Sequence, residues 1–267
     1  MISNLSVGAM FLGGLVPGVI AAAGILLANW LVARRDPRLA GERTPFSFAT
    51  LRRTALAAIP ALAMPVIVVV GIIGGVVTPT EASALAVAAG LIISLLVYRE
   101  MTLADLPDLL LRAAGLSATV MIIIATASVY SWLIAIQNVP ALISGWFGDH
   151  AASQFAFILA INVLLLVVGM FLESISAILI LLPVLMPVAL QLGLDPIHVG
   201  VLVSINLSIG LITPPYGICL FVASTVAERP IGAVSRRVWI PLIPLLATLL
   251  LISYAPGVVL FLPRLLM

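Results

Sequence analysis

Two stretches of the chain have the length and hydrophobicity of membrane helices, yet each is interrupted near its middle. The first, residues 154–191, is broken at Gly169–Ser174, and the second, residues 197–228, is broken at Gly210–Gly217. Irregular backbone inside a bilayer leaves amide and carbonyl groups unpaired, and lipid cannot bond to them. Such breaks therefore persist only where protein, water, ions or substrate supply the partners. Secondary transporters build their binding sites from paired breaks near the membrane midplane, so the sequence indicates transport.

The rest of the chain is typical of an all-α polytopic membrane protein. Of its 267 residues, 63% are hydrophobic and 8% are charged, and the mean hydropathy is +1.33. A soluble domain could not bury so much apolar surface. The apolar runs are continuous rather than alternating, which excludes a transmembrane β-barrel. Further spans are expected over residues 7–33, 56–77, 79–98, 113–139 and 238–262, with residues 99–112 as a short interfacial piece.

The charged and reactive side chains exclude several classes of function. All twelve basic residues are arginines in short loops, which indicates membrane topology and no nucleic-acid partner. The single cysteine, Cys219, excludes a disulfide or a thiolate cluster, and two histidines, His150 and His198, are too few for a metal site. Phosphate loops and catalytic triads are absent from the sequence, so we expect no enzyme and no cofactor.

Arginine placement also predicts the orientation. If residues 154–191 form a re-entrant hairpin and residues 197–228 cross once, eleven arginines share one side and only Arg264 lies on the other. The positive-inside rule makes the arginine-rich side cytoplasmic. This topology places Met1 outside and leads us to expect an inverted N-terminal half that is missing or encoded elsewhere. The eleven are Arg34, Arg35, Arg38, Arg43, Arg52, Arg53, Arg99, Arg112, Arg229, Arg236 and Arg237.

The second break is expected to expose both kinds of helix end. Gly210 is predicted to take a left-handed conformation and end a half-helix that carries Asn206. Thr213 would then cap the next half-helix, with Pro214 as its first residue. Free carbonyls at the first end suit Na⁺, and free amides at the second suit a substrate carboxylate. The alternative is a proline kink that serves packing alone.

The first break is predicted to be the tip of a re-entrant hairpin. Its arms have roughly 15–18 residues, or about 22–27 Å of helix, which is short for a hydrocarbon core of about 30 Å. Glu173 is the only carboxylate deep in an apolar run, so a role in coupling is one interpretation. The other is a first-turn glutamate that stabilises the second arm, and the two are compatible. Ser174 either caps this arm or reaches the substrate.

Several smaller patterns have structural interpretations. Thr78 and Glu81 have capping-box spacing, and so do Thr102 and Asp105. Gly14 and Gly18 suit close helix packing. Polar residues in the second half of the fourth span indicate hydrogen bonds between helices or, alternatively, the lining of a substrate cavity. They are Thr126, Ser128, Tyr130, Ser131, Gln137 and Asn138.

Three segments together resemble a known family. Gly-Val-Val-Thr-Pro-Thr-Glu-Ala (75–82), Gly-Met-Phe-Leu-Glu (169–173) and Gly-Leu-Ile-Thr-Pro-Pro-Tyr-Gly (210–217) are similar, in order and spacing, to the large permease subunit of TRAP transporters. These are tripartite, ATP-independent periplasmic systems for organic acids such as C4-dicarboxylates, keto acids and sialic acid. The resemblance covers essentially the whole chain and corresponds to the C-terminal portion of that subunit.

The resemblance implies an elevator-type ion transporter fold, of which this chain is one of two inverted repeats. Residues 1–112 are expected to form scaffold and arm helices, and residues 113–267 the transport region. The expected location is the bacterial inner membrane, as a multi-pass protein. Expected partners are a small permease subunit, a periplasmic substrate-binding protein, the N-terminal half of the permease and the lipid bilayer.

The resemblance also assigns candidate site residues. Na⁺ is expected at Gly169, Gly210, Thr213 and Tyr216, mainly through backbone carbonyls. Substrate-binding candidates are Ser174, Thr213 and Pro214, while Glu173 and Asn206 are coupling or structural candidates. Two alternatives stay open: an ion-coupled carboxylate exchanger without a binding protein, and a structural subunit or non-functional fragment.

Overall fold

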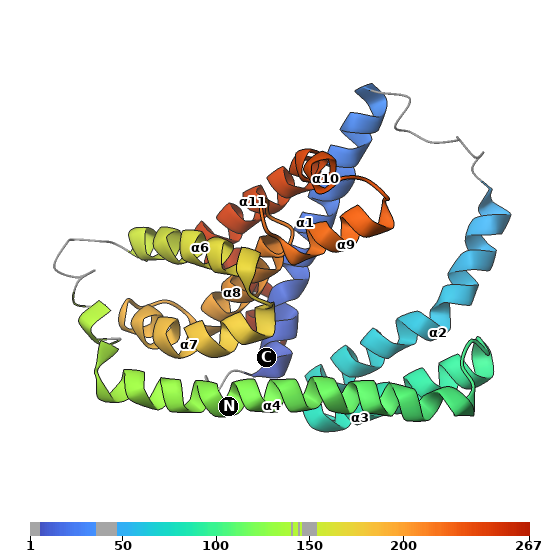
Figure 1. Cartoon of the computed structure of the whole chain (residues 1–267), viewed down its shortest axis with the longest axis horizontal. Coiled ribbons are helices and arrows are strands. Elements are labelled where there is room, and N and C mark those ends of the chain that lie inside the picture. Colours follow the sequence, from blue (N-terminus) through green and yellow to red (C-terminus); the bar gives the residue numbers. More distant parts are fainter. Residues whose placement is uncertain (1–5, 36–46, 140, 144, 146–153) are drawn as a thin grey trace.

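The computed structural model describes residues 6–35, 47–139, 141–143, 145 and 154–267, and all regular structure within them is helical (Figure 1). The elements are α1 (Val7–Arg35), α2 (Phe48–Ile73), α3 (Pro79–Ile92), η2 (Ile93–Val97), η3 (Leu103–Asp105), α4 (Leu106–Ile136), α6 (Gln154–Phe171), α7 (Ser174–Gln191), α8 (Pro196–Gly210), α9 (Ile218–Val226), α10 (Ile231–Arg237), α11 (Trp239–Tyr254) and α12 (Pro256–Leu266). In this part of the chain six helices are long and apolar enough to span a membrane, or up to eight if each of two bent pairs counts as one span. Three residues named in the sequence analysis lie outside the described residues: Arg38, Arg43 and His150.

Local sequence signals account for several helix starts. Thr78 begins α3 with a complete capping box, since Glu81 N–H donates to its hydroxyl and the Glu81 carboxylate accepts from its backbone N–H at 2.7 Å. Thr102 and Asp105 form the second predicted box ahead of α4. The predicted interfacial piece over residues 99–112 is wrong in part. Helical backbone runs without interruption from Leu103 to Ile136, so most of that piece extends the fourth span.

The last predicted span is bent rather than straight. α11 and α12 meet at an angle of 67° around Ala255, whose backbone angles are φ −120° and ψ 73°. Proline disfavours the α conformation in the residue before it, and Pro256 follows directly. The helix therefore ends at Tyr254, and a new helix begins at Pro256. A hydropathy window over residues 238–262 does not detect this break, because proline leaves the average hydropathy high.

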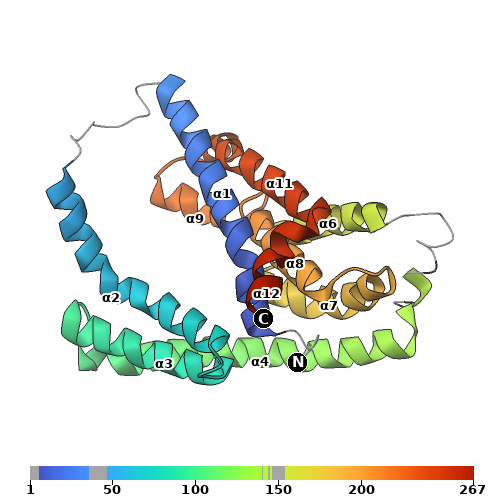
Figure 2. The ribbon, with the colours of Figure 1, turned by 180° about the vertical axis from the view of Figure 1, so that it is seen from behind.

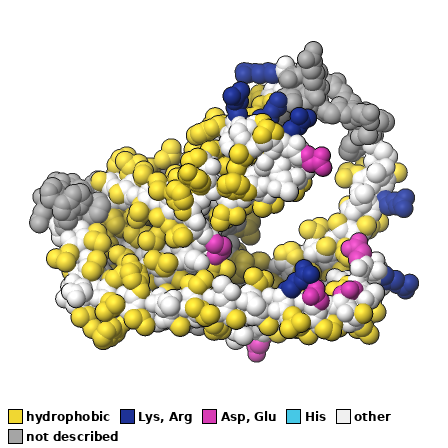
Figure 3. All heavy atoms as spheres, in the orientation of Figure 1, with side chains coloured by type: hydrophobic (Ala, Val, Ile, Leu, Met, Phe, Trp, Pro, Cys, Tyr) yellow, Lys and Arg dark blue, Asp and Glu magenta, His cyan; other side chains and the backbone are white. Residues whose placement is uncertain are grey.

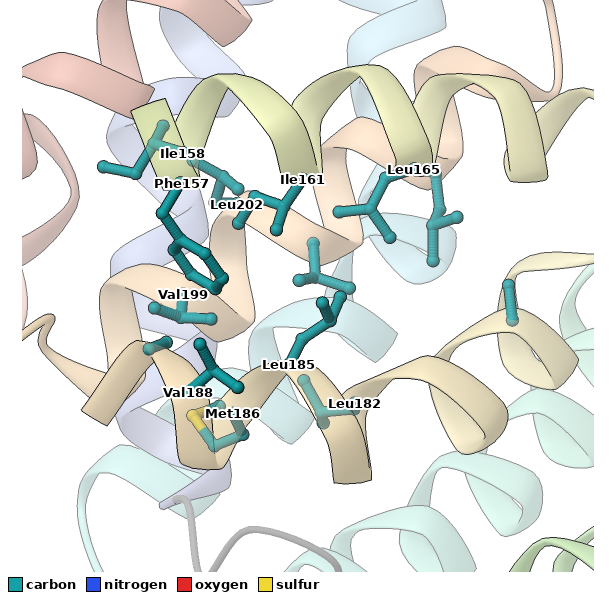
Figure 4. Close-up of a cluster of buried hydrophobic side chains, with 14 residues drawn as sticks. Phe157, Ile158, Ile161, Leu165, Leu182, Leu185, Met186, Val188, Val199 and Leu202 are labelled. Atoms are coloured by element: carbon teal, nitrogen blue, oxygen red, sulfur yellow. The ribbon is translucent and has the colours of Figure 1, made fainter. Parts of the chain in front are cut away.

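The largest apolar core joins the hairpin arms to α8. Figure 4 shows Phe157 and Ile161 of α6 directed toward Leu185 and Val188 of α7, with Val199 of α8 beside them. All of these side chains are buried. This core supports the two interrupted elements from one side and places them next to each other.

α1 packs against α8, α11 and α12 and crosses the region behind the hairpin (Figure 2). The close packing predicted at Gly14 and Gly18 does not occur within the described residues, where a Cβ at either position would meet nothing within 4 Å. The close contacts fall instead at Gly13, where a Cβ would lie 3.1 Å from Val201 Cγ2, and at Gly24, where it would lie 2.9 Å from Pro244 Cβ. One residue along a helix turns the contact face by about 100°.

Candidate functional site

Residues 154–191 form a helical hairpin in which the start of α6 lies beside the end of α7. α6 and α7 each have 18 residues, and only Leu172 and Glu173 lie between them. The Gln154 side-chain amide donates to the Leu192 carbonyl oxygen, so the chain leaves the hairpin beside the place where it entered. The tip, where α6 ends and α7 begins, lies at the opposite end.

Glu173 caps α7 at this tip. Its carboxylate Oε2 accepts the backbone N–H groups of Ile175 and Ser176 at 3.0 and 3.3 Å. The interpretation of Glu173 as a stabiliser of the second arm is thereby confirmed, because a negative group at a helix N-terminus complements the positive end of its dipole. These two amides are occupied by protein. Ser174 begins α7, and its hydroxyl is buried without a hydrogen-bond partner within the described chain.

The second break also exists, but Gly210 does not end its helix in the predicted way. Gly210 is the last residue of α8, and Leu211 caps the helix with right-handed backbone angles of φ −59° and ψ −23°. The predicted left-handed conformation of Gly210 is wrong. Glycine is required here for a different reason: a Cβ on Gly210 would lie 2.7 Å from Gly169 Cα and 2.8 Å from the Gly169 carbonyl carbon.

The second half-helix begins four residues later than predicted. Thr213 is not its cap, since the Thr213 hydroxyl donates to the Ile209 carbonyl at 2.8 Å and α9 starts at Ile218. Pro215 explains the shift, because it disfavours a helical conformation at Pro214. The bond between these prolines is cis. Thr213 and Pro214 thus lie in the connecting loop, whose amides and carbonyls bond to each other and to the helix ends.

Gly217 closes that loop. The backbone N–H of Gly217 donates to Thr213 O at 3.1 Å, and Cys219 N–H donates to Leu211 O at 3.0 Å. A Cβ on Gly217 would lie 2.5 Å from Leu211 O and 2.9 Å from Thr213 N. The absence of a side chain therefore lets the chain turn back against the end of α8 before α9 begins.

The two breaks meet at a contact between glycine backbones. A Cβ on Gly169, in the last turn of α6, would lie 3.1 Å from both Gly210 Cα and Leu207 O. Beyond this contact, the rings of Phe171 and Tyr216 lie 5.2 Å apart, one from each break. Tyr216 remains 55% exposed. Gly169 and Gly210 therefore lie in contact, and Thr213 N–H donates to Gly210 O at 2.9 Å, while the contact of Tyr216 with the first break is made through Phe171. The sodium site that the resemblance implies at these four residues stays a prediction.

The geometry of this contact concentrates negative partial charge. α6 and α8 both end where they touch, and the last carbonyl groups of a helix have no partner in the next turn. Each helix C-terminus carries the equivalent of roughly −0.5 elementary charge. Carbonyl oxygens have two lone pairs, so one that accepts a backbone hydrogen bond can still ligate a cation. α9 points its N-terminus, the positive end, toward the same loop.

A buried network of polar side chains, of which the sequence analysis named only Asn206, links three helices beside the contact. Asn206 of α8 is fully buried, and its Nδ2 donates to Asn162 O at 3.1 Å and Asn162 Oδ1 at 2.8 Å. Asn162 of α6 in turn donates to Ser253 Oγ of α11 at 2.8 Å. A lone asparagine inside an apolar helix was the available signal, because polar groups at such depth need partners. Asn206 Oδ1 is buried without a partner among the described residues.

Replacing Asn162 by alanine is expected to destabilise the protein by about 1–3 kcal/mol, since it leaves buried polar groups of Asn206 and Ser253 with fewer partners. Thermal unfolding of the purified protein in detergent measures the change. Ser204→Ala is the control, because the Ser204 hydroxyl bonds only to Gly200 O within α8. Equal thermal stability of the two variants would show that this network of polar side chains does not stabilise the fold.

Polar side chains of α4 and α8 also have hydrogen-bond partners within the described residues. The hydroxyls of Thr126, Ser128 and Ser131 donate to carbonyls one turn earlier in α4, at Ile122, Ile124 and Ala127. The expected bonds between helices are thus wrong for these three residues. His198, to which the sequence analysis assigned no metal site, lies in the first turn of α8. It is 2% exposed, and its Nε2 lies 2.8 Å from Ile252 O, which ties the start of α8 to α11.

Comparison with known proteins decides the family. A family model described as "Tripartite ATP-independent periplasmic transporter, DctM component" matches residues 1–258. The chain belongs to the DctM family. Members of this family are components of a transporter rather than enzymes. The resemblance that the three sequence segments indicated is therefore confirmed, and the chain is a multi-pass membrane protein of the TRAP permease type.

The proteins similar to this chain are named as transporters of different substrates. The chain is 40% identical over 97% of its length to the isethionate TRAP transporter permease protein DctMQ of Oleidesulfovibrio alaskensis, covering 41% of that protein. It is 37% identical over 99% of its length to the C4-dicarboxylate large permease DctM of Rhodobacter capsulatus, covering 60% of it, and 33% identical to the sialic acid large permease SiaM of Vibrio cholerae, covering 62%. The chain thus spans about 41–62% of the length of these relatives.

Proposed function

We propose that this chain supplies a sodium site and part of the substrate site of the large membrane subunit of a TRAP transporter that imports an organic acid. The observation that carries the proposal is the contact of Gly169 with Gly210, which joins the C-termini of α6 and α8. Two negative helix ends in an apolar surrounding attract a cation, and carbonyl oxygens suit Na⁺. We assign the ion to the backbone at Gly169, Gly210, Thr213 and Tyr216.

The substrate is placed on the other side of the same loop. We assign its carboxylate to donors at the start of α9 and to the free Ser174 hydroxyl, with Thr213 and Pro214 in contact with the rest of the substrate. The Thr213 N–H and hydroxyl are not counted as donors, because they already donate to Gly210 O and Ile209 O. Because the Ile175 and Ser176 amides at the start of α7 already donate to Glu173, we assign the Ser174 side chain as the donor from the hairpin. With Na⁺ beside it, a carboxylate can be neutralised without a buried arginine. Glu173 and Asn206 act here by holding the two breaks in place.

The proposed assembly is larger than this chain. We assign full activity to the chain together with an N-terminal permease half and a small permease subunit in the bacterial inner membrane, and a periplasmic binding protein. The two permease halves are inverted repeats in this proposal, and the transporter moves by an elevator mechanism. The relatives support this assignment in that their names describe TRAP permeases and they are longer than the chain. Two of these names give the acids to test first: C4-dicarboxylates and sialic acid.

The test is uptake of radiolabelled succinate and sialic acid by proteoliposomes that contain the assembled permease, with binding protein outside. An inward Na⁺ gradient is compared with an equal K⁺ gradient. We expect uptake of one acid, at least tenfold faster with Na⁺ and dependent on the binding protein. Uptake that ignores the Na⁺ gradient contradicts the proposed coupling, and uptake without the binding protein favours the exchanger. No uptake of any organic acid by a folded, assembled permease would contradict the function itself.

A further inference from the structure

Basic side chains gather at one end of the molecule, where α1 ends and α10 lies (Figures 1 and 3). Arg34 and Arg35 occupy the last turn of α1, and Arg236 and Arg237 the last turn of α10. The Arg34 guanidinium lies 4.1 Å from the centre of the Trp30 ring. Tryptophan is enriched at the level of lipid headgroups, and arginine marks the cytoplasmic side. This end of the protein therefore meets the headgroups of the inner leaflet.

A hollow at this end combines positive charge with an apolar wall. It has a volume of about 690 Å³, and its lining consists of Ala227, Arg229, Ala233, Val234, Arg237 and Val238. Glu228 belongs to the same turn but is not part of the lining. The ion pair recorded within the described residues is Arg112–Asp108, so no carboxylate in that part of the chain lies within ion-pair distance of Arg229 or Arg237.

The backbone holds the two arginines on either side of the short helix α10. Ser224 Oγ donates to Arg229 O at 2.6 Å, which fixes the turn after α9, and α9 and α10 meet at 111°. Arg229 thus precedes α10 and Arg237 ends it. Ala233 and Val234 form the wall between them. Small side chains there leave room for a hydrocarbon chain rather than filling the hollow.

A second hollow repeats the combination between α1 and α11. It has a volume of about 280 Å³, and its lining is apolar except for Arg35. The lining residues are Ala28, Leu31, Val32, Arg35, Ile240, Ile243 and Pro244. Two hollows whose linings include residues near the start of α11 thus combine apolar side chains with arginine.

We propose that the hollow at Arg229 and Arg237 binds an anionic phospholipid of the inner leaflet. The two guanidinium groups hold the headgroup phosphate, for which arginine provides paired donors. One acyl chain lies along Ala233, Val234 and Val238. Basic pockets at the cytoplasmic side of membrane helices recognise anionic headgroups in this way. A free phosphate would use the same donors but would leave the apolar wall exposed, so the proposal commits to the lipid.

The experiment measures lipid retention by the assembled permease with native mass spectrometry. Phosphatidylglycerol is compared with phosphatidylcholine of identical acyl chains, and inorganic phosphate is added as a competitor in a separate arm. The test variant is Arg229→Gln with Arg237→Gln. The control is Arg99→Gln with Arg112→Gln, which changes the net charge equally in exposed arginines away from the hollow. Sodium-driven uptake is not the readout, so the result stands apart from the proposed function.

We expect the wild type and the control to retain phosphatidylglycerol at least tenfold more strongly than phosphatidylcholine, and the test variant to lose this preference. Equal preference in the test variant would overturn the proposal. Displacement of the lipid by millimolar phosphate would also overturn it, because the apolar wall would then contribute nothing. If the double variant does not assemble, Ala233→Trp fills the hollow while keeping both arginines, and retained preference in that variant counts against the site.

Discussion

Replacing Gly210 by alanine is expected to reduce sodium-driven uptake by at least a hundredfold. The added Cβ would lie 2.7 Å from Gly169 Cα and 2.8 Å from the Gly169 carbonyl carbon. Both are backbone atoms, which cannot rotate out of the way, so α6 and α8 must separate. Overpacking of this kind costs about 1–3 kcal/mol, and the larger consequence is that the two helix ends no longer face one ion. Proteoliposome uptake of the identified substrate measures the effect.

The matched control is Gly14→Ala. Gly14 also lies in an apolar helix, but a Cβ there meets nothing within 4 Å, so the same chemical change should leave uptake near the wild-type rate. Both variants are compared at equal amounts of inserted protein. Wild-type uptake by Gly210→Ala would show that close contact of the two breaks is not needed for transport.

Gly217→Ala is expected to have the second large effect, a loss of uptake of more than tenfold. Its Cβ would lie 2.5 Å from Leu211 O, the acceptor for Cys219 N–H. The Leu211 carbonyl must turn away, this hydrogen bond breaks, and the start of α9 loosens. The position of the α9 N-terminus, which we assign to the substrate carboxylate, is then lost.

The native cysteine reports this change directly. Cys219 is exposed and lies in the first turn of α9, so a thiol reagent should label it faster in Gly217→Ala than in the wild type. Gly115→Ala, in α4, is the control because a Cβ there meets nothing within 4 Å. Unchanged labelling together with unchanged uptake would contradict the role of the loop.

Much of the fold follows from the sequence because hydropathy and capping are local. The breaks at residues 172–173 and 211–217 and the capping boxes at Thr78 and Thr102 all depend on neighbouring residues. The sequence also indicated that glycines in the two breaks come together. Helix length was enough to predict two short arms joined at a tip, and α6 and α7 have 18 residues each. The re-entrant path that arginine placement favours stays a prediction.

The errors arose where tertiary contacts or consecutive prolines decide the outcome. Gly210 looked like a left-handed helix end, whereas its small size serves a contact with Gly169, 41 positions earlier in the numbering. Pro215 delayed the start of α9 beyond Pro214, although the rule for residues before proline was available from the sequence. The partners of Asn162 are 44 and 91 residues away, so no local pattern could identify them.

The most direct test is a measurement of ²²Na⁺ binding to the purified, assembled permease by scintillation proximity. It asks whether the adjoining C-termini of α6 and α8 hold the coupling ion. Full-length subunits with wild-type sequence, with Gly14→Ala and with Gly210→Ala are titrated side by side in sodium-free buffer. The account predicts saturable binding in the first two, and in Gly210→Ala the loss of one ion or at least a tenfold weaker site, which corresponds to about 1.4 kcal/mol. Identical isotherms for all three proteins would contradict it.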